Sequence, residues 1–230
     1  MANRTIYIPM RNQLGVVEKE IEFEWFPGFS VVQKQRSISS LHDKAANENV
    51  HPILEISSKS PDEAGVRASA FNLSFKMKKS GRLVSVEAAF QGSKTFAHSG
   101  PFPDMYEMSA REAKKAIRSR QVGTLTKFTF FGKEFPLKPR TFFYDWLYIK
   151  TMSLHEELYS KIFDYAAFSD IEFNPNKSIN CQAYSAALFV SLQHCGLLEE
   201  ALESEIVFKR VLSEVYRKRE ARSSFQSSLI

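Results

Sequence analysis

Hydrophobic and polar residues alternate with the period of a half-buried strand near the start of the chain. Ile21, Phe23 and Trp25 alternate there with three glutamates, which predicts a strand over residues 20–26. A turn at Pro27-Gly28 follows it. The same pattern analysis predicts further strands over residues 4–9, 51–57, 71–75 and 125–131, and helices over residues 29–46, 85–97, 109–120, 141–167 and 181–194.

Two of the predicted helices begin with residues that cap a helix. Ser60 and Glu63, like Ser109 and Glu112, have the spacing of a capping box. A hairpin that turns at Gly132 is the alternative to the last predicted strand. We expect one or two further helices in the last 30 residues.

Together these elements predict an α+β fold, a mostly helical single domain with a small antiparallel sheet over residues 1–230. The 20 phenylalanines supply ample material for a core. Two cysteines are too few for a disulfide framework, and the five histidines lack the spacing of a zinc site, so we expect no metal and no cofactor. No apolar run approaches the roughly 18–20 residues of a membrane span, and we find no secretion signal, so we expect a cytoplasmic protein.

The net charge of +5 is concentrated in the middle of the chain. Residues 76–140 contain 14 basic and five acidic residues, an excess of nine positive charges. An asymmetry of this size is typical of a surface that binds a polyanion such as nucleic acid. The alternative is an ordinary solvated surface.

The sharpest chemical pattern lies between Ser85 and Phe96. On a helix, Glu87, Gln91 and Lys94 have the spacing i, i+4 and i+7 and share one face. A carboxylate can stabilise the charge that develops on a sugar when its N-glycosidic bond breaks. A buried lysine can attack the sugar and form a Schiff base. The alternative is an exposed helix that carries a Glu–Gln–Lys ladder.

This string resembles the signature helix of the NADAR (YbiA-like) family, E-x-x-x-Q-x-x-K-F, with the final Phe displaced by one. Three later segments resemble further family motifs in the right order, but the Trp-Gly pair of the last motif is missing. The N-terminal half resembles the branch encoded beside DarT-type toxins. The resemblance covers about residues 20–195 and leaves about 197–230 as a C-terminal helical extension. The segments that carry it, besides residues 85–96, are residues 109–115, Arg140, Asp145, Trp146, Lys150, Met152, Asp170 and Asn180, and in the N-terminal half Trp25, Phe29, residues 33–38, Leu41 and His42.

The resemblance implies an N-glycosidase that removes ADP-ribose from guanine in nucleic acid, as the antitoxin of a DarT-type DNA ADP-ribosyltransferase. Its substrate would be ADP-ribosylated DNA, its product ADP-ribose and its partner the toxin, and the basic block would hold phosphates. The residues implied as catalytic are Lys94, Glu87 and Asp145. The residues expected to contact the substrate are Gln91, Trp25, Phe29, Gln33, Lys34, Arg36, Trp146, Asp170 and Asn180.

Structural roles stay open for several of these residues. Trp25 and Phe29 can stack on a base or serve as core or lid residues, and Trp146 suits a core position. The polar residues that begin the helix after Phe29 can hold a pyrophosphate or form a solvated edge. Asn180 suits an N-cap. Two other functions also stay open, a glycosidase of small ribosylamino-pyrimidine metabolites and a non-enzymatic antitoxin that binds the toxin.

Overall fold

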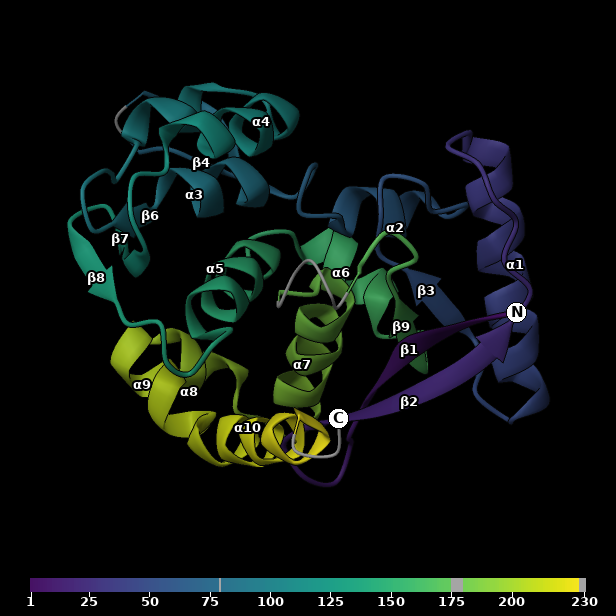
Figure 1. The fold of residues 1–230 in the computed structure, drawn as a ribbon. Helices are drawn as coiled ribbons and strands as arrows, with labels where there is room; N and C mark the ends of the chain where they lie inside the picture. The colour runs from purple at the N-terminus through teal and green to yellow at the C-terminus, as the bar shows by residue number, and fades with distance from the viewer. Residues whose placement is uncertain (79, 175–179, 228–230) are drawn as a thin grey trace.

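The computed structural model describes residues 1–78, 80–174 and 180–227, with side chains as far as residue 221. One end of the molecule is built from β1 (Ala2–Pro9), β2 (Val16–Phe23), α1 (Val31–Asn47), β3 (Ile53–Glu55) and β9 (Ala167–Ser169). The strands form one sheet in the order β2-β1-β9-β3, and α1 lies at the outer edge of the molecule (Figure 1). Strand β1 is antiparallel to both β2 and β9, whereas β3 and β9 are parallel.

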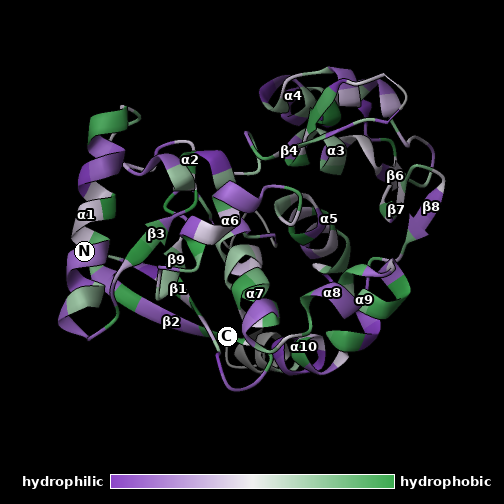
Figure 2. Cartoon of the chain, turned by 180° about the vertical axis from the view of Figure 1, so that it is seen from behind, coloured by the Kyte–Doolittle hydropathy of each residue, from purple (hydrophilic) through white to green (hydrophobic). Residues whose placement is uncertain are grey.

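Helix α1 begins at a hydrogen-bonded N-cap residue and presents one apolar face to this sheet. The Ser30 hydroxyl accepts a hydrogen bond from the Gln33 amide, as an N-cap does. Ile38, Leu41 and Ala45 recur at helical spacing and are fully buried in a cluster with apolar residues of β1 and β2. Most of the other residues of the helix are polar, apart from the exposed Val31 and Val32 at its start, and Figure 2 shows hydrophilic and hydrophobic residues side by side on it.

The opposite end of the molecule holds two small antiparallel sheets and two helices (Figure 1). A hairpin turning at Gly132 joins the last two strands, and the capping box of Ser109 and Glu112 opens the longer helix, so both predictions are confirmed. The elements are β4 (Ser74–Lys76), β5 (Leu83–Ser85), α3 (Val86–Gly92), β6 (Lys94–Phe96), the 3-10 helix η1 (Pro103–Glu107), α4 (Ala110–Arg120), β7 (Leu125–Phe130) and β8 (Lys133–Phe135).

Between the two ends lie α5 (Phe142–Met152) and α7 (Gln182–His194), in the centre of Figure 1. Every residue of α7 from 183 to 192 is buried, because these residues are small or apolar on all sides of the helix. The expected α+β, mostly helical fold is confirmed. The remaining helices are α2 (Glu63–Ala68), α6 (Glu156–Ile162), α8 (Leu198–Leu202), α9 (Glu205–Val211) and α10 (Ser213–Ser227). Within the described part of the chain, no helix has the length and apolar character needed to cross a bilayer.

The helix predicted over residues 85–97 is shorter than expected. It ends at Gly92, and Lys94 begins a strand that pairs with β7. A Cβ on Gly92 would lie 2.6 Å from the Tyr106 ring, so only glycine fits where η1 crosses the helix end. The backbone amide of Phe102 donates to the Gly92 carbonyl, which occupies an acceptor that a longer helix would use.

Two other sequence predictions are also wrong in detail. The helix expected over residues 141–167 is divided into α5, α6 and strand β9, since residues 167–169 pair with β3. That pairing depends on residues more than a hundred positions earlier, which a local pattern cannot register. The expected cap at Ser60 is displaced by two residues, because the Asp62 carboxylate accepts from the Ala64 amide and caps α2.

Asp145 ties α5 to α7 and α10 from inside the core. Its carboxylate accepts hydrogen bonds from the hydroxyls of Thr141 at 2.6 Å, Ser185 at 2.6 Å and Tyr216 at 3.2 Å. Burial raises the pKa of Asp145, while the positive charge of Arg219 and the three hydroxyl donors act against that rise. The C-terminal helices therefore dock on a buried carboxylate as well as on apolar surface.

We predict that Tyr216→Phe lowers the free energy of unfolding by about 1.5 kcal/mol or more, because a hydrogen bond to a buried charged group is lost. Unfolding in urea followed by circular dichroism measures the change. Tyr159→Phe is the matched control, since its hydroxyl has no hydrogen-bond partner among the described residues and the ring is kept. Equal stability of the Tyr216 variant and the wild-type protein would contradict the assignment.

Candidate active site

Glu87 and Gln91 form a buried polar pair on α3. The Ser85 hydroxyl accepts from the Ala88 amide at 3.2 Å and caps the helix, which places Glu87 in its first turn. The Gln91 amide donates to Glu87 Oε1 at 2.9 Å, and both side chains are only 6% exposed. A carboxylate this deeply buried is unusual for a solvated helix, so the exposed-ladder alternative is wrong for these two residues.

Lys94 lies just beyond the end of α3, and its half-buried side chain packs against aromatic rings. Its Nζ atom is 5.1 Å from the centre of the Phe90 ring, and its register partner in β7 is Phe128, whose ring also packs on Phe90. Burial lowers the pKa of Lys94; the negative charge of Glu87 raises it and the positive charge of Lys114 lowers it further. The result is a lysine amine that loses its proton more easily than one in water, as a nucleophile needs.

Lys114, on α4, completes this group. Its Nζ atom lies 3.9 Å from Glu87 Oε1 and 5.1 Å above the Phe71 ring. Lys114 belongs to the basic block and to the segment of residues 109–115 that resembles the family, but it was not predicted as a site residue, because nothing in its local pattern shows that α4 packs against α3. The group of Glu87, Gln91, Lys94 and Lys114 is called the α3 site below.

A second pair of buried carboxylates lies at one edge of the four-stranded sheet. Because β3 and β9 run parallel, Glu55 at the end of one and Asp170 just after the other come together there. The Ser169 hydroxyl donates to Glu55 Oε2 at 2.5 Å, and the Glu172 and Phe173 amides donate to Asp170 Oδ1. Burial raises the pKa of both carboxyl groups, and the negative charge of Glu55 raises the pKa of Asp170 further. Glu55 was not singled out from the sequence.

Tyr144, on α5, connects this carboxylate pair with the α3 site. Its ring packs edge-on against Phe90 with centres 5.2 Å apart. Burial raises the pKa of the Tyr144 hydroxyl, and the negative charges of Glu87 and Asp170 raise it further, which places the ring within electrostatic reach of both carboxylates. The tyrosine therefore stays a neutral phenol that can donate a hydrogen bond.

The neighbouring residues of α5 that were expected in the site face elsewhere. Asp145 is engaged by hydroxyls from α5, α7 and α10. Trp146 is half-buried and packs against Phe130 and Phe135 of the β7–β8 hairpin. Asn180 lies directly before Cys181, the N-cap residue of α7, so it is not itself the cap.

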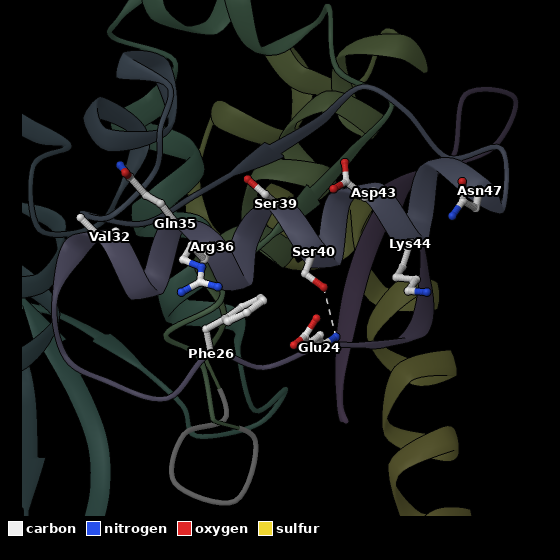
Figure 3. A pocket seen from close by; sticks show the side chains of 10 residues that line it. All are labelled: Glu24, Phe26, Val32, Gln35, Arg36, Ser39, Ser40, Asp43, Lys44 and Asn47. Atoms are coloured by element: carbon white, nitrogen blue, oxygen red, sulfur yellow. Dashed lines mark hydrogen bonds between the residues drawn. The ribbon is translucent and has the colours of Figure 1, made fainter.

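The N-terminal residues expected to hold the substrate gather around α1, which Figure 1 places at the other end of the molecule from α3. Lys34 Nζ lies 4.6 Å from the centre of the Trp25 ring, and the Arg36 guanidinium lies 4.1 Å from that of Phe26. Figure 3 shows Phe26 and Arg36 with polar residues along the outer face of α1, lining a shallow hollow. Phe29 is 99% exposed, whereas Gln33 is half-buried. The structure does not bring this group to Lys94.

One chain of contacts does lead from α1 toward the buried carboxylates. His42 Nε2 lies 2.9 Å from the Ser169 hydroxyl, which in turn donates to Glu55. Burial lowers the pKa of His42 to about 4, so its imidazole is neutral at pH 7. Within the described residues, no group of three or more His, Cys, Asp and Glu side chains is placed to hold a metal ion.

Comparison with protein families gives a match over residues 2–222, to a family described as the DarT1-associated NADAR antitoxin. The chain belongs to this family. A comparison with curated proteins finds no match. The match extends at both ends beyond residues 20–195, over which the sequence resemblance was recognised. It therefore includes β1 and the part of α10 that carries Tyr216.

We predict that Lys114→Gln raises the pKa of Lys94, because the substitution removes a repelling cation and leaves the negative charge of Glu87 unopposed. The fraction of unprotonated Lys94 amine at neutral pH then falls. Titration of 13C-methylated lysines by NMR measures the change in this pKa. Lys115→Gln is the matched control, since Lys115 is exposed and makes no ion pair within the described part of the chain. An unchanged or lower Lys94 pKa in the Lys114 variant would contradict the geometry of the α3 site.

Proposed function

We propose that this NADAR antitoxin is an N-glycosidase that removes ADP-ribose from guanine bases of DNA and so reverses the modification made by a DarT-type toxin. The observation that carries the proposal is the half-buried Lys94 amine over the Phe90 ring, within electrostatic reach of the buried Glu87 carboxylate. The family match supports an antitoxin associated with such a toxin. No part of this chemistry requires a metal or a cofactor.

In the proposed reaction, the unprotonated Lys94 amine attacks the anomeric carbon of the ribose as the bond to the guanine amino nitrogen breaks. The lysine nitrogen loses a proton in this step, and the leaving guanine nitrogen gains one. In this proposal Glu87, whose charge acts on Lys94, accepts the first proton and delivers the second, so no external acid is consumed. The linked sugar opens to an imine, and water then hydrolyses it to release ADP-ribose and regenerate the lysine.

The other residues of the site have supporting roles in this proposal. Gln91 orients Glu87 through the hydrogen bond at 2.9 Å, and Lys114 keeps the pKa of Lys94 low. Asp170 is the carboxylate proposed to hold a ribose hydroxyl, since it shares Tyr144 as a neighbour with Glu87. Asp145 supports the site as a positioning residue, because three hydroxyl donors already occupy its oxygens.

We predict that Lys94→Ala abolishes release of ADP-ribose from a modified oligonucleotide, a loss of at least about a hundredfold for a covalent nucleophile. Mass spectrometry of the oligonucleotide before and after incubation measures the activity, and circular dichroism checks the fold. Lys115→Ala serves as the control for loss of one positive charge nearby. A folded Lys94 variant with full activity would show that the lysine is not the nucleophile.

We also predict that borohydride added during turnover traps the protein on the sugar. Borohydride reduces an imine to a stable amine, so the peptide that contains Lys94 should gain the mass of ADP-ribose less one oxygen atom, and Glu87→Gln should reduce the yield. Peptide mapping by mass spectrometry locates the adduct. Active protein that forms no adduct at this peptide would rule out the imine and favour direct attack by water.

A further inference from the structure

An apolar groove of about 530 Å3 lies between β4, the end of β7 and α5. Its volume is in the range of small-ligand sites. Aromatic side chains form its floor, and Lys76, Lys78 and Lys150 stand at its rim. The proposed reaction uses none of these residues. Besides the three lysines, the lining residues are Phe75, Met77, Phe130, Phe131, Trp146, Leu147, Thr151 and Leu154.

The floor of the groove is a continuous set of rings. Phe130 packs edge-on against Phe75 and against Trp146, with ring centres 5.9 and 6.0 Å apart. Phe131 packs on Phe130 with ring centres 4.5 Å apart and planes tilted by 59°, and it is 57% exposed. A phenylalanine that is held by other rings and still open to solvent is a rigid platform for a flat ligand.

The three lysines at the rim are not among the basic residues that form ion pairs nearby. Lys114, Lys127, Lys133, Arg82 and Arg120 all pair with carboxylates. Within the described part of the chain, no ion pair involves Lys76, Lys78 or Lys150, and Lys150 donates only to the Leu202 carbonyl at 3.3 Å. Their charge is therefore available to an anionic ligand.

Strand β7 connects the groove with the position of Lys94. Lys94 faces Phe128 across the β6–β7 ladder, and Phe130 lies two residues further on the same face of the strand, about 7 Å away. Phe143 stacks on both Phe90 and Phe128, so the same aromatic layer lies under the amine and borders the groove.

We propose that this groove binds unpaired nucleotides that flank the modified guanine, with one base stacked on Phe131 and the phosphates held by Lys76, Lys78 and Lys150. The proposal rests on the function proposed above and adds a site for the strand itself. Exposed rings beside unpaired lysines are what a single strand needs, since every base has a flat face and every linkage a negative charge. A purely apolar protein segment would leave these three cations without partners.

The test measures binding of an unmodified, fluorescein-labelled single strand of about 12 thymidines by anisotropy at several salt concentrations. Lys76→Gln with Lys78→Gln should weaken binding and flatten the slope of log K against log salt by about 1.4, which corresponds to two phosphate contacts. Phe131→Leu should lower the affinity about fivefold or more, because leucine keeps the apolar area but lacks the flat ring. Phe131→Tyr keeps the ring and should bind the probe with the affinity of the wild-type protein.

Two controls separate this proposal from the chemistry. Arg11→Gln with Lys44→Gln removes two exposed charges, one in the β1–β2 loop and one on α1, that do not line the groove, and should leave the salt slope unchanged. Lys94→Ala should bind the probe as the wild-type protein does. If the wild-type protein releases no ADP-ribose and the groove variants still lose binding, the proposed function fails while the groove remains a nucleic-acid site.

Two results would overturn the proposal. One is an unchanged affinity and salt slope in both the double lysine variant and Phe131→Leu. The other is normal probe binding in these variants together with loss of a complex with the purified toxin, which would assign the groove to a protein partner.

Discussion

The burial of an amine and a carboxylate against the same aromatic layer is the constraint on which the rest of the molecule depends. Taking charged groups out of water is costly unless each has partners. Glu87 has Gln91 and Lys114, whereas Lys94 has mainly rings around it, and its lowered pKa reflects that difference. The phenylalanines of α3, β7 and α5 are therefore more than core material, because burial against them lowers the pKa of this amine.

The end of α3 at Gly92 is part of the same arrangement. If the helix continued, Lys94 would stand about 10.5 Å along the axis from Glu87, two turns away on the same face. Instead the chain turns into β6, the Lys94 side chain comes over the Phe90 ring, and the Glu87 charge acts on its pKa. The crossing of η1 over Gly92 thus determines where the amine lies, although η1 carries none of the reacting groups.

The sequence predicts what depends on local pattern and misses what depends on distant pairing. The strands near the N-terminus, the capping box at Ser109, the hairpin at Gly132 and the Glu87–Gln91–Lys94 motif all have signals within a few residues. The end of α3 depends on pairing with residues about 30 positions later, and the approach of Glu55 to Asp170 depends on a parallel pair more than 100 residues apart. Asp145 is a further example. The motif identifies this residue but does not show that its hydrogen-bond partners come from α7 and α10.

Helix α5 contacts helix α3, helices α7 and α10, and the groove through three consecutive residues. Successive side chains of a helix point about 100° apart, so they can face three different neighbours. Tyr144 faces Phe90 and the carboxylates, Asp145 faces α7 and α10, and Trp146 faces the hairpin and the groove. A small rotation of α5 would disturb all three contacts at once. The hydroxyls that hold Asp145 therefore fix the rotation of α5 about its axis, and with it the alignment of the α3 site with the groove.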